Sequence, residues 1–267
     1  MLAVIKGAGD LASGVAHRFF RAGLKVVMTE VPVPTTVRRT VAFSPAIYLG
    51  HAQVEGVTAI RAESARRAEE VIAQGAIPVL ADPGGVVIRQ LCPDVVVDAI
   101  LAKRNTGTTM SDAPAVIALG PGFYAGKDCH AVVETKRGHY LGRVIYEGEA
   151  IPDTGIPGEV GGYTVQRLVR GTGSGPFEPL AAIGDRVHSG QLIARCGETP
   201  VFAAIDGVLR GLLQGGVPVF EGMKCGDIDP RCERDHCFTI SDKARAVAGG
   251  ALEAALCLRH KRGRGAF

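Results

Sequence analysis

The sequence predicts an α/β protein: a Rossmann-like domain with a parallel sheet (1–150), a small all-β domain (165–230), and a C-terminal helix with a basic tail (238–267). Three observations predict this organisation. Apolar runs alternate with helical patterns in the first half, which is typical of strands and helices joined as βαβ units. Beyond about residue 165, short apolar runs are separated by frequent turn residues, which indicates an all-β region. An alanine-rich stripe with helical spacing follows near the C-terminus.

A βαβ unit opens the chain. Residues 2–6 form a short apolar strand, and Leu11–Arg21 has the apolar spacing of a helix that Gly23 ends. Residues 25–29 form a second strand, which ends at Glu30. This order favours a parallel pair, because parallel strands need a crossover connection. The same alternation predicts a helix over 63–74 and strands over 57–61, 77–81, 95–100, 115–119 and 131–134.

A weak internal repeat lies in the β-rich region. The pattern G-x-x-V-x-x-G occurs at 184–190 and again at 216–222, and duplicated halves of this size suit two interlocked hairpin motifs. The stretches 184–194 and 204–208 resemble the half-motif of biotinyl/lipoyl-type domains, which carry a modified lysine at a central hairpin. The hairpin region 196–200 has no lysine. We therefore interpret this region as a barrel-sandwich hybrid used for packing or docking, and expect no covalent biotin or lipoyl group.

A C-terminal helix is predicted over 241–260. Ser241 suits its cap and Asp242 its first turn, and the small and aliphatic residues that follow form one apolar stripe. The basic residues 259–264 are interpreted as a solvated end.

Composition narrows the functional classes. Hydrophobic residues make up 46% and charged residues 21% of the 267 residues, which excludes a disordered chain. A net charge of +3 and the absence of tryptophan argue against nucleic-acid binding. The N-terminus lacks the layout of a signal peptide and no apolar run of about 18 residues occurs, so we expect a cytoplasmic protein without membrane attachment. Its seven cysteines are then most simply reduced thiols.

The turn after the first strand predicts a phosphate site. Residues 7–12 fit the pattern G-x-G-x-x-A, in which the glycines permit a tight turn and let a pyrophosphate approach the start of a helix. Glu30 ends the next strand, where a carboxylate would accept hydrogen bonds from ribose hydroxyls. A tight βαβ turn without a nucleotide is the alternative. The predicted cofactor-binding residues here are Gly7, Gly9, Asp10, Leu11, Ala12 and Glu30.

Two further loops follow apolar strands and could face the same crevice, because ligands of open α/β sheets bind beyond the carboxyl ends of the strands. Their cations, hydroxyls and amide suit an anionic or phosphorylated ligand. A solvated basic loop is the alternative. The predicted binding residues are Lys103, Arg104, Asn105, Thr106, Gly107, Gly120 and Gly122.

No catalytic or metal site is assigned. Glu134 and His139 are weak candidates for proton exchange, and the question whether the chain is an enzyme stays open. The spacing of Cys225, Cys232 and the adjacent His236-Cys237 pair matches no common zinc pattern, so we expect no metal.

Several longer stretches together resemble the YqeB-type accessory proteins of selenium-dependent molybdenum hydroxylase systems, whose first domain is related to XdhC-like Rossmann proteins. The resemblance implies a maturation factor that handles a molybdopterin-type cofactor, with the hydroxylase apoprotein or its cofactor-maturation proteins as partners. The stretches that carry it are 6–12, 37–43, 97–107, 118–123, 137–145, 226–231 and 240–245.

Two other functions stay open from the residues alone. The glycine turn with Glu30 is compatible with an NAD(P)-dependent oxidoreductase, because a molybdopterin dinucleotide and a nicotinamide dinucleotide both carry a pyrophosphate. A scaffold that docks a partner through the β region is the third hypothesis. The sequence also leaves homo-oligomer formation open.

Overall fold

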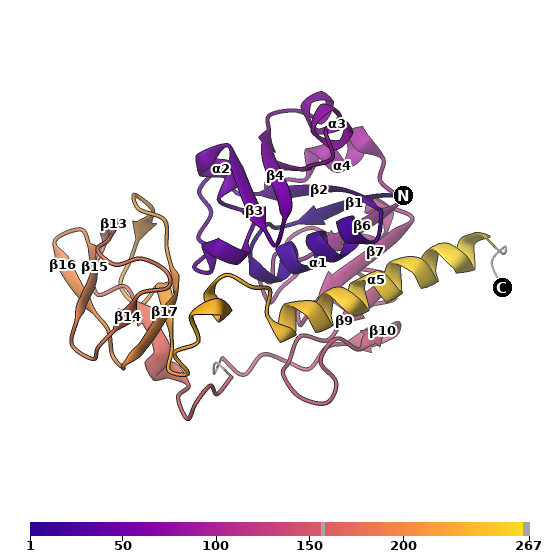
Figure 1. Cartoon of the computed structure of the whole chain (residues 1–267). Helices are drawn as coiled ribbons and strands as arrows, with labels where there is room; N and C mark the ends of the chain where they lie inside the picture. Colours follow the sequence, from indigo (N-terminus) through magenta and orange to yellow (C-terminus); the bar gives the residue numbers. More distant parts are fainter. Residues whose placement is uncertain (156–157, 264–267) are drawn as a thin grey trace.

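The computed structural model describes residues 1–155 and 158–263. Within them, the chain forms a large mixed sheet covered by helices and, beside it, two four-stranded antiparallel sheets (Figure 1). The large sheet has the strand order β10-β9-β7-β6-β1-β2-β5-β4-β3. Its strands are β1 (Leu2–Lys6), β2 (Lys25–Glu30), β3 (His51–Val54), β4 (Val57–Ala62), β5 (Ile77–Ala81), β6 (Val95–Asp98), β7 (Ala115–Leu119), β9 (Ala131–Val133) and β10 (Val144–Ile145).

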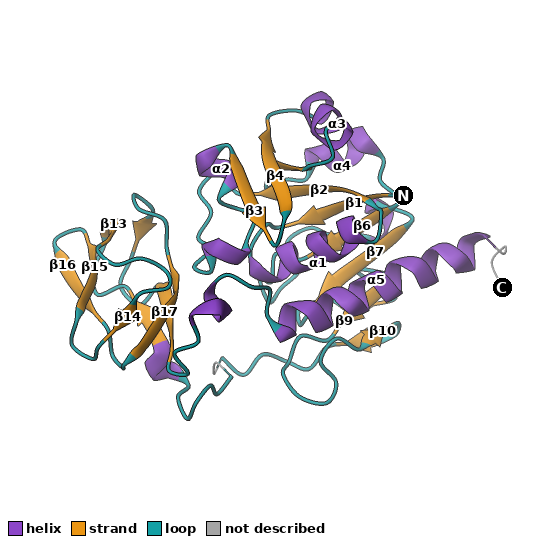
Figure 2. Cartoon of the chain, viewed as in Figure 1, coloured by secondary structure: helices purple, strands orange, loops and turns teal. Residues whose placement is uncertain are grey.

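Helices cover both faces of this sheet, which explains why its central strands are apolar throughout. Ile5 and Val97 point to the face covered by α1 and α5, whereas Val4 and Val96 point to the face covered by α3 and α4. Figure 2 shows α5 lying along α1. The helices are α1 (Asp10–Arg21), α2 (Ala46–Leu49), α3 (Ala65–Ala73), α4 (Val86–Leu91) and α5 (Asp242–Gly263).

The second part of the chain, residues 168–229, consists of two antiparallel sheets with a shared apolar core. The repeated glycine motif contains two short strands, β14 (Arg186–Val187) and β18 (Pro218–Val219), each at the edge of one sheet, with Val187 and Val219 buried. One sheet contains β12 (Leu168–Arg170), β19 (Lys224–Asp229), β17 (Gly207–Leu212) and β14 (Arg186–Val187). The other contains β16 (Thr199–Phe202), β15 (Leu192–Cys196), β13 (Gly175–Pro179) and β18 (Pro218–Val219).

The remaining elements of the described residues are short. They are a two-stranded sheet of β8 (Tyr124–Ala125) and β11 (Gly148–Glu149), and the 3-10 turns η1 (Arg39–Val41), η2 (Met110–Asp112), η3 (Val165–Arg167) and η4 (Arg234–Cys237).

None of the helices in the described ranges combines the length and apolar character needed to cross a membrane.

The predicted fold class, a Rossmann-like parallel-sheet domain followed by a small barrel-sandwich hybrid domain and a C-terminal helix, is wrong. The first sheet is a large mixed sheet in which β5 lies between β2 and β4, and antiparallel strands β3 and β10 form its edges. The second part is a pair of four-stranded antiparallel sheets, and α5 packs on α1 and the large sheet. Alternating apolar runs indicate strands and helices but do not specify the order of strands in a sheet.

Seven of the nine strands of the large sheet lie where the sequence predicts them. The edge strands β3 and β10, the helices α2 and α4, and the short elements of residues 1–150 were not predicted. α2 and α4 are too short to show a helical period, and β3 is a half-exposed edge strand without an apolar run. α5 extends to Gly263, three residues beyond its predicted end at His260.

Candidate functional site

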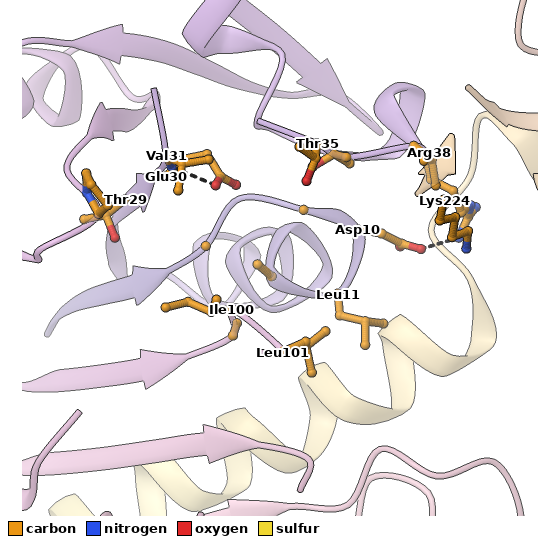
Figure 3. A pocket seen from close by; sticks show the side chains of 17 residues that line it. Asp10, Leu11, Thr29, Glu30, Val31, Thr35, Arg38, Ile100, Leu101 and Lys224 are labelled. Atoms are coloured by element: carbon orange, nitrogen blue, oxygen red, sulfur yellow. Dashed lines mark hydrogen bonds and ion pairs between the residues drawn. The ribbon is translucent and has the colours of Figure 1, made fainter. Parts of the chain in front are cut away.

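The main candidate site is a cavity of about 490 Å³ beyond the carboxyl ends of β1, β2, β5 and β6. All six residues that the sequence assigned to the glycine turn and its acidic partner line this cavity. Figure 3 shows Glu30 near one end of the site, and Asp10 with Arg38 and Lys224 at the other. The volume falls within the range of small-molecule sites, about 300–1,000 Å³.

The glycine turn brings backbone amides to this cavity. Gly7 has φ +97°, and a Cβ there would lie 3.0 Å from the carbonyl oxygen of Ala99, so the turn packs against the end of β6. Gly9 is the residue before α1, and no side chain caps the helix. The first amides of α1 are therefore available to an anion, and the helix dipole favours one there.

Glu30 fixes the turn from the neighbouring strand. Its carboxylate accepts hydrogen bonds from the backbone N–H of Ala8 (2.9 Å) and of Val31 (2.8 Å). Burial raises the pKa of Glu30, although these two hydrogen bonds act in the opposite direction. The predicted contact with ribose hydroxyls stays a prediction. The carboxylate lines the cavity, but its observed hydrogen bonds are to backbone.

Arg38 neutralises the acidic residue at the start of α1. Its Nη1 donates to Asp10 Oδ2 at 2.6 Å, and its Nη2 donates to the carbonyl oxygens of His236 (3.2 Å) and Thr239 (3.5 Å). Arg38 is 8% exposed, and its Nε is buried without a hydrogen-bond partner. An arginine held this firmly, with one donor unused, is suited to an anionic ligand.

Lys224 brings a second cation from another part of the chain. It lies on β19 of the second part and lines the same cavity. Partial desolvation lowers the pKa of the Lys224 ammonium, and the nearby Asp227 carboxylate opposes this effect. Because Thr35 and Thr36 also line the cavity, hydroxyls and cations surround the helix start.

The Lys6 side chain anchors the loop that follows β6. Its Nζ donates to Thr108 Oγ1 at 2.5 Å and lies 3.6 Å from Asp98 Oδ2, while Thr108 Oγ1 donates to the same carboxylate oxygen at 2.5 Å. All three side chains are buried. This cluster ties residues 99–108 to the sheet beside the cavity.

The structure separates the predicted residues of the strand-end loops. Lys103 lines a second cavity of about 190 Å³ and pairs with Asp153 (2.6 Å). Asn105 closes its own loop, because its side chain accepts from the N–H groups of Gly107 and Thr108 and donates to the Thr108 carbonyl. Among the described residues, Arg104, Asn105, Thr106 and Gly107 line neither of these two cavities.

Gly120 and Gly122 bring loops close together. A Cβ at Gly122 would lie 2.5 Å from the backbone nitrogen of Arg104, and one at Gly120 would lie 2.6 Å from Thr135 Oγ1. Both glycines also have positive φ. Close packing and positive φ explain why glycine occupies these two positions. Their contact with a ligand stays a prediction.

Glu134 and His139 have separate surroundings. The buried Glu134 carboxylate accepts from the backbone N–H of Lys136 (2.7 Å) and of Ile151 (2.8 Å). His139 is exposed and packs edge-on against Tyr140, with ring centroids 5.0 Å apart. Their catalytic role stays a prediction.

Sequence reasoning missed Arg38, Lys224 and the two threonines. Arg38 lies in a long connection after β2, and Lys224 is about 200 residues away on the second part. The basic pair Arg38-Arg39 was the available signal. It could not reveal that Arg38 turns toward Asp10.

Sequence comparison identifies one close relative. The chain is 51% identical over 260 residues to the uncharacterized protein YqeB of Escherichia coli (strain K12). The match covers 97% of the chain but 48% of YqeB, so the chain spans about half the length of this relative. No protein-family model matches the sequence.

Solved structures resemble the chain weakly. They include the ectoine utilization protein EutE (DoeB) from Ruegeria pomeroyi (TM-score 0.25, 14% identity) and an aspartoacylase family protein from Mesorhizobium loti (TM-score 0.29, 10% identity), each matched over 85% of this chain and 84% of its own. A succinylglutamate desuccinylase/aspartoacylase from Rhodobacter sphaeroides has a TM-score of 0.26 and 15% identity over the same shares.

Proposed function

We propose that this YqeB-like chain binds a cofactor that carries a pyrophosphate, with the two phosphates at the start of α1. The observation that carries this proposal is the uncapped start of α1 facing a cavity of about 490 Å³ that Arg38 and Lys224 also line. The amides supply hydrogen bonds, and the two cations supply charge. Arg38 Nε, buried and unpartnered, is a further donor for such a group.

The physiological role that we propose is maturation of a molybdenum hydroxylase. The pyrophosphate would belong to a molybdopterin-type dinucleotide that the protein prepares, delivers or modifies. The seven stretches that resemble YqeB-type accessory proteins support this role, and they are spread over nearly the whole chain. Deletion of the gene should leave the hydroxylase poor in cofactor or lacking selenium, and full hydroxylase activity in the deletion strain would contradict the role.

Binding is tested by calorimetric titration with inorganic pyrophosphate and with ADP. Gly9→Asp places a carboxylate at the cavity without backbone strain, because Gly9 has φ −72° and a Cβ there would have its nearest neighbour, Thr36 Oγ1, at 3.5 Å. We expect this variant to lose binding. Gly249→Asp on α5, whose Cβ would face Arg18 rather than the cavity, is the matched control and should bind normally. Equal binding by both variants would contradict the site.

A nicotinamide dinucleotide is the second candidate ligand, and Glu30 favours it. The carboxylate lines the cavity beside the turn, where ribose hydroxyls could add to its present hydrogen bonds. An NAD(P)-dependent oxidoreductase would bind NAD or NADP measurably. Calorimetry without detectable binding of either at millimolar concentration removes this candidate.

A further inference from the structure

A second cavity adjoins the first. It measures about 190 Å³, and Leu11 and Leu101 line both cavities. Ligand sites usually exceed about 300 Å³, so the second cavity is small for a site of its own. Its shared lining residues place it directly beside the larger cavity, where it could receive a further part of the same ligand.

The backbone between the two cavities has an unusual conformation. Leu101 and Lys103 both have φ +60°, in the left-handed region that residues other than glycine avoid. These conformations direct Leu101 to the shared wall and Lys103 to the wall of the second cavity. Strain of this kind gathers at ligand-binding positions.

Lys243 gives the second cavity its chemistry. It lies in the first turn of α5 and is half-buried. Among the described residues its ammonium has no hydrogen-bond partner, whereas Lys103 in the same wall is paired with Asp153. Burial lowers the pKa of Lys243 and the neighbouring charge of Arg137 lowers it further, whereas the carboxylates of Asp10, Glu134 and Asp153 raise it. An ammonium that makes no hydrogen bond within the described residues can donate one to a ligand in the cavity.

We propose that the second cavity holds the far half of a two-part ligand, and that Lys243 donates a hydrogen bond to an oxygen acceptor of that half. This inference rests on the proposed function, because it requires the pyrophosphate to occupy the first cavity. The Thr135 hydroxyl, in the same wall, supplies a second polar group for that half. The apolar shared wall, Leu11 and Leu101, would pack against the connection between the two halves.

Amine labelling of the full chain tests both cavities at once. The rate at which acetic anhydride modifies Lys224 and Lys243 is measured by mass spectrometry with ADP, NAD or molybdopterin guanine dinucleotide present. We expect ADP to protect Lys224 alone and at least one dinucleotide to protect both lysines. Lys261, on α5 beside Tyr146, is the internal control and should react equally throughout.

The possible failures are distinguishable. A dinucleotide that protects Lys224 but leaves Lys243 reactive overturns the second half-site and retains the first. Absence of protection at Lys224 by all three probes overturns the proposed function and this inference with it. Lys243→Met provides an independent check: it should weaken the dinucleotide about tenfold, the effect of one hydrogen bond to a charged group, without changing ADP affinity. Lys261→Met should change neither, and equal dinucleotide affinity in the two variants would overturn the role of Lys243.

Discussion

Arg38 and Asp10 form an ion pair of 2.6 Å between the long connection after β2 and the first residue of α1. This pair removes an apparent conflict in the sequence, where a carboxylate lies beside a predicted phosphate site. The arginine offsets the charge of Asp10, and its buried Nε has no hydrogen-bond partner among the described residues. The same pair holds the connection against the start of the helix.

Asp10→Asn should strengthen anion binding. The variant removes the competing charge and leaves the Arg38 guanidinium free for a ligand, so we expect about a tenfold gain in affinity for inorganic pyrophosphate, equivalent to about 1.4 kcal/mol. Calorimetry measures this change. Arg38→Met should have the opposite effect, and weaker binding by Asp10→Asn would show that the carboxylate itself takes part in the site.

Glu30 should make stability depend on pH. Burial raises its pKa above the ordinary value of 4.5, so the folded protein retains this proton to higher pH than the unfolded chain. The contribution of Glu30 to the free energy of unfolding is therefore full below pH 4.5, and it is lost as the pH rises through the pKa of the folded state. Urea unfolding at increasing pH should show the wild type losing stability relative to Glu30→Gln. A difference that grows in favour of the wild type would contradict the burial of a carboxylate here, and the exposed Glu63→Gln is the control.

Alanine substitutions at two adjacent glycines of α5, Gly249 and Gly250, should change the free energy of unfolding in opposite directions. A Cβ at Gly250 would lie 2.1 Å from the Gly142 carbonyl oxygen, whereas one at Gly249 would have Arg18 Nη1 at 3.9 Å as its nearest neighbour. We expect Gly250→Ala to lower the free energy of unfolding by about 1–3 kcal/mol through overpacking. Gly249→Ala should raise it by about 0.5–1 kcal/mol through helix propensity. Denaturant unfolding of both variants tests the packing of α5, and a Gly250→Ala variant as stable as the wild type would contradict it.

The buried Lys6 and Asp98 should be energetically coupled. Lys6→Met leaves the buried Asp98 carboxylate without its cation, which should cost about 3–5 kcal/mol. Lys6→Met/Asp98→Asn should lose less than the sum of the two single variants, because the uncompensated charge is gone. Thermal unfolding of the four proteins gives the coupling, and additive losses would show that the pair does not interact.

The sequence predicted the local elements around the site better than their assembly. The run 2–6, the turn at Gly7 and Gly9 and the strand ending at Glu30 have short-range signals, and the structure has them as β1, the turn and β2. The position of β5 between β2 and β4 has no such signal, because the order of strands depends on packing between distant segments. The predicted fold class failed because the antiparallel edge strands of the large sheet and the pairing of the second part into two four-stranded sheets also depend on such packing.

The site shows the same division. Residues near the turn could be assigned from their spacing, and all six line the cavity. Lys224 could not, because its place depends on how the second part of the chain lies against the connection that carries Arg38, where Leu212 N–H of β17 donates to the Val37 carbonyl. Conversely, Asn105 and Gly122 are residue types that suit a ligand-binding loop, but the structure explains them by packing. Asn105 accepts from Gly107 N–H within its own loop, and Gly122 lies against the backbone of Arg104 in the neighbouring loop.

Mass spectrometry of the small molecules released from the purified native protein tests the central claim most directly. The account predicts a pyrophosphate-containing cofactor in about one copy per chain from the wild type and from Gly249→Asp, and none from Gly9→Asp. Equal retention of the same molecule by Gly9→Asp, or a released ligand without phosphate, would contradict the assignment of the cavity at the start of α1.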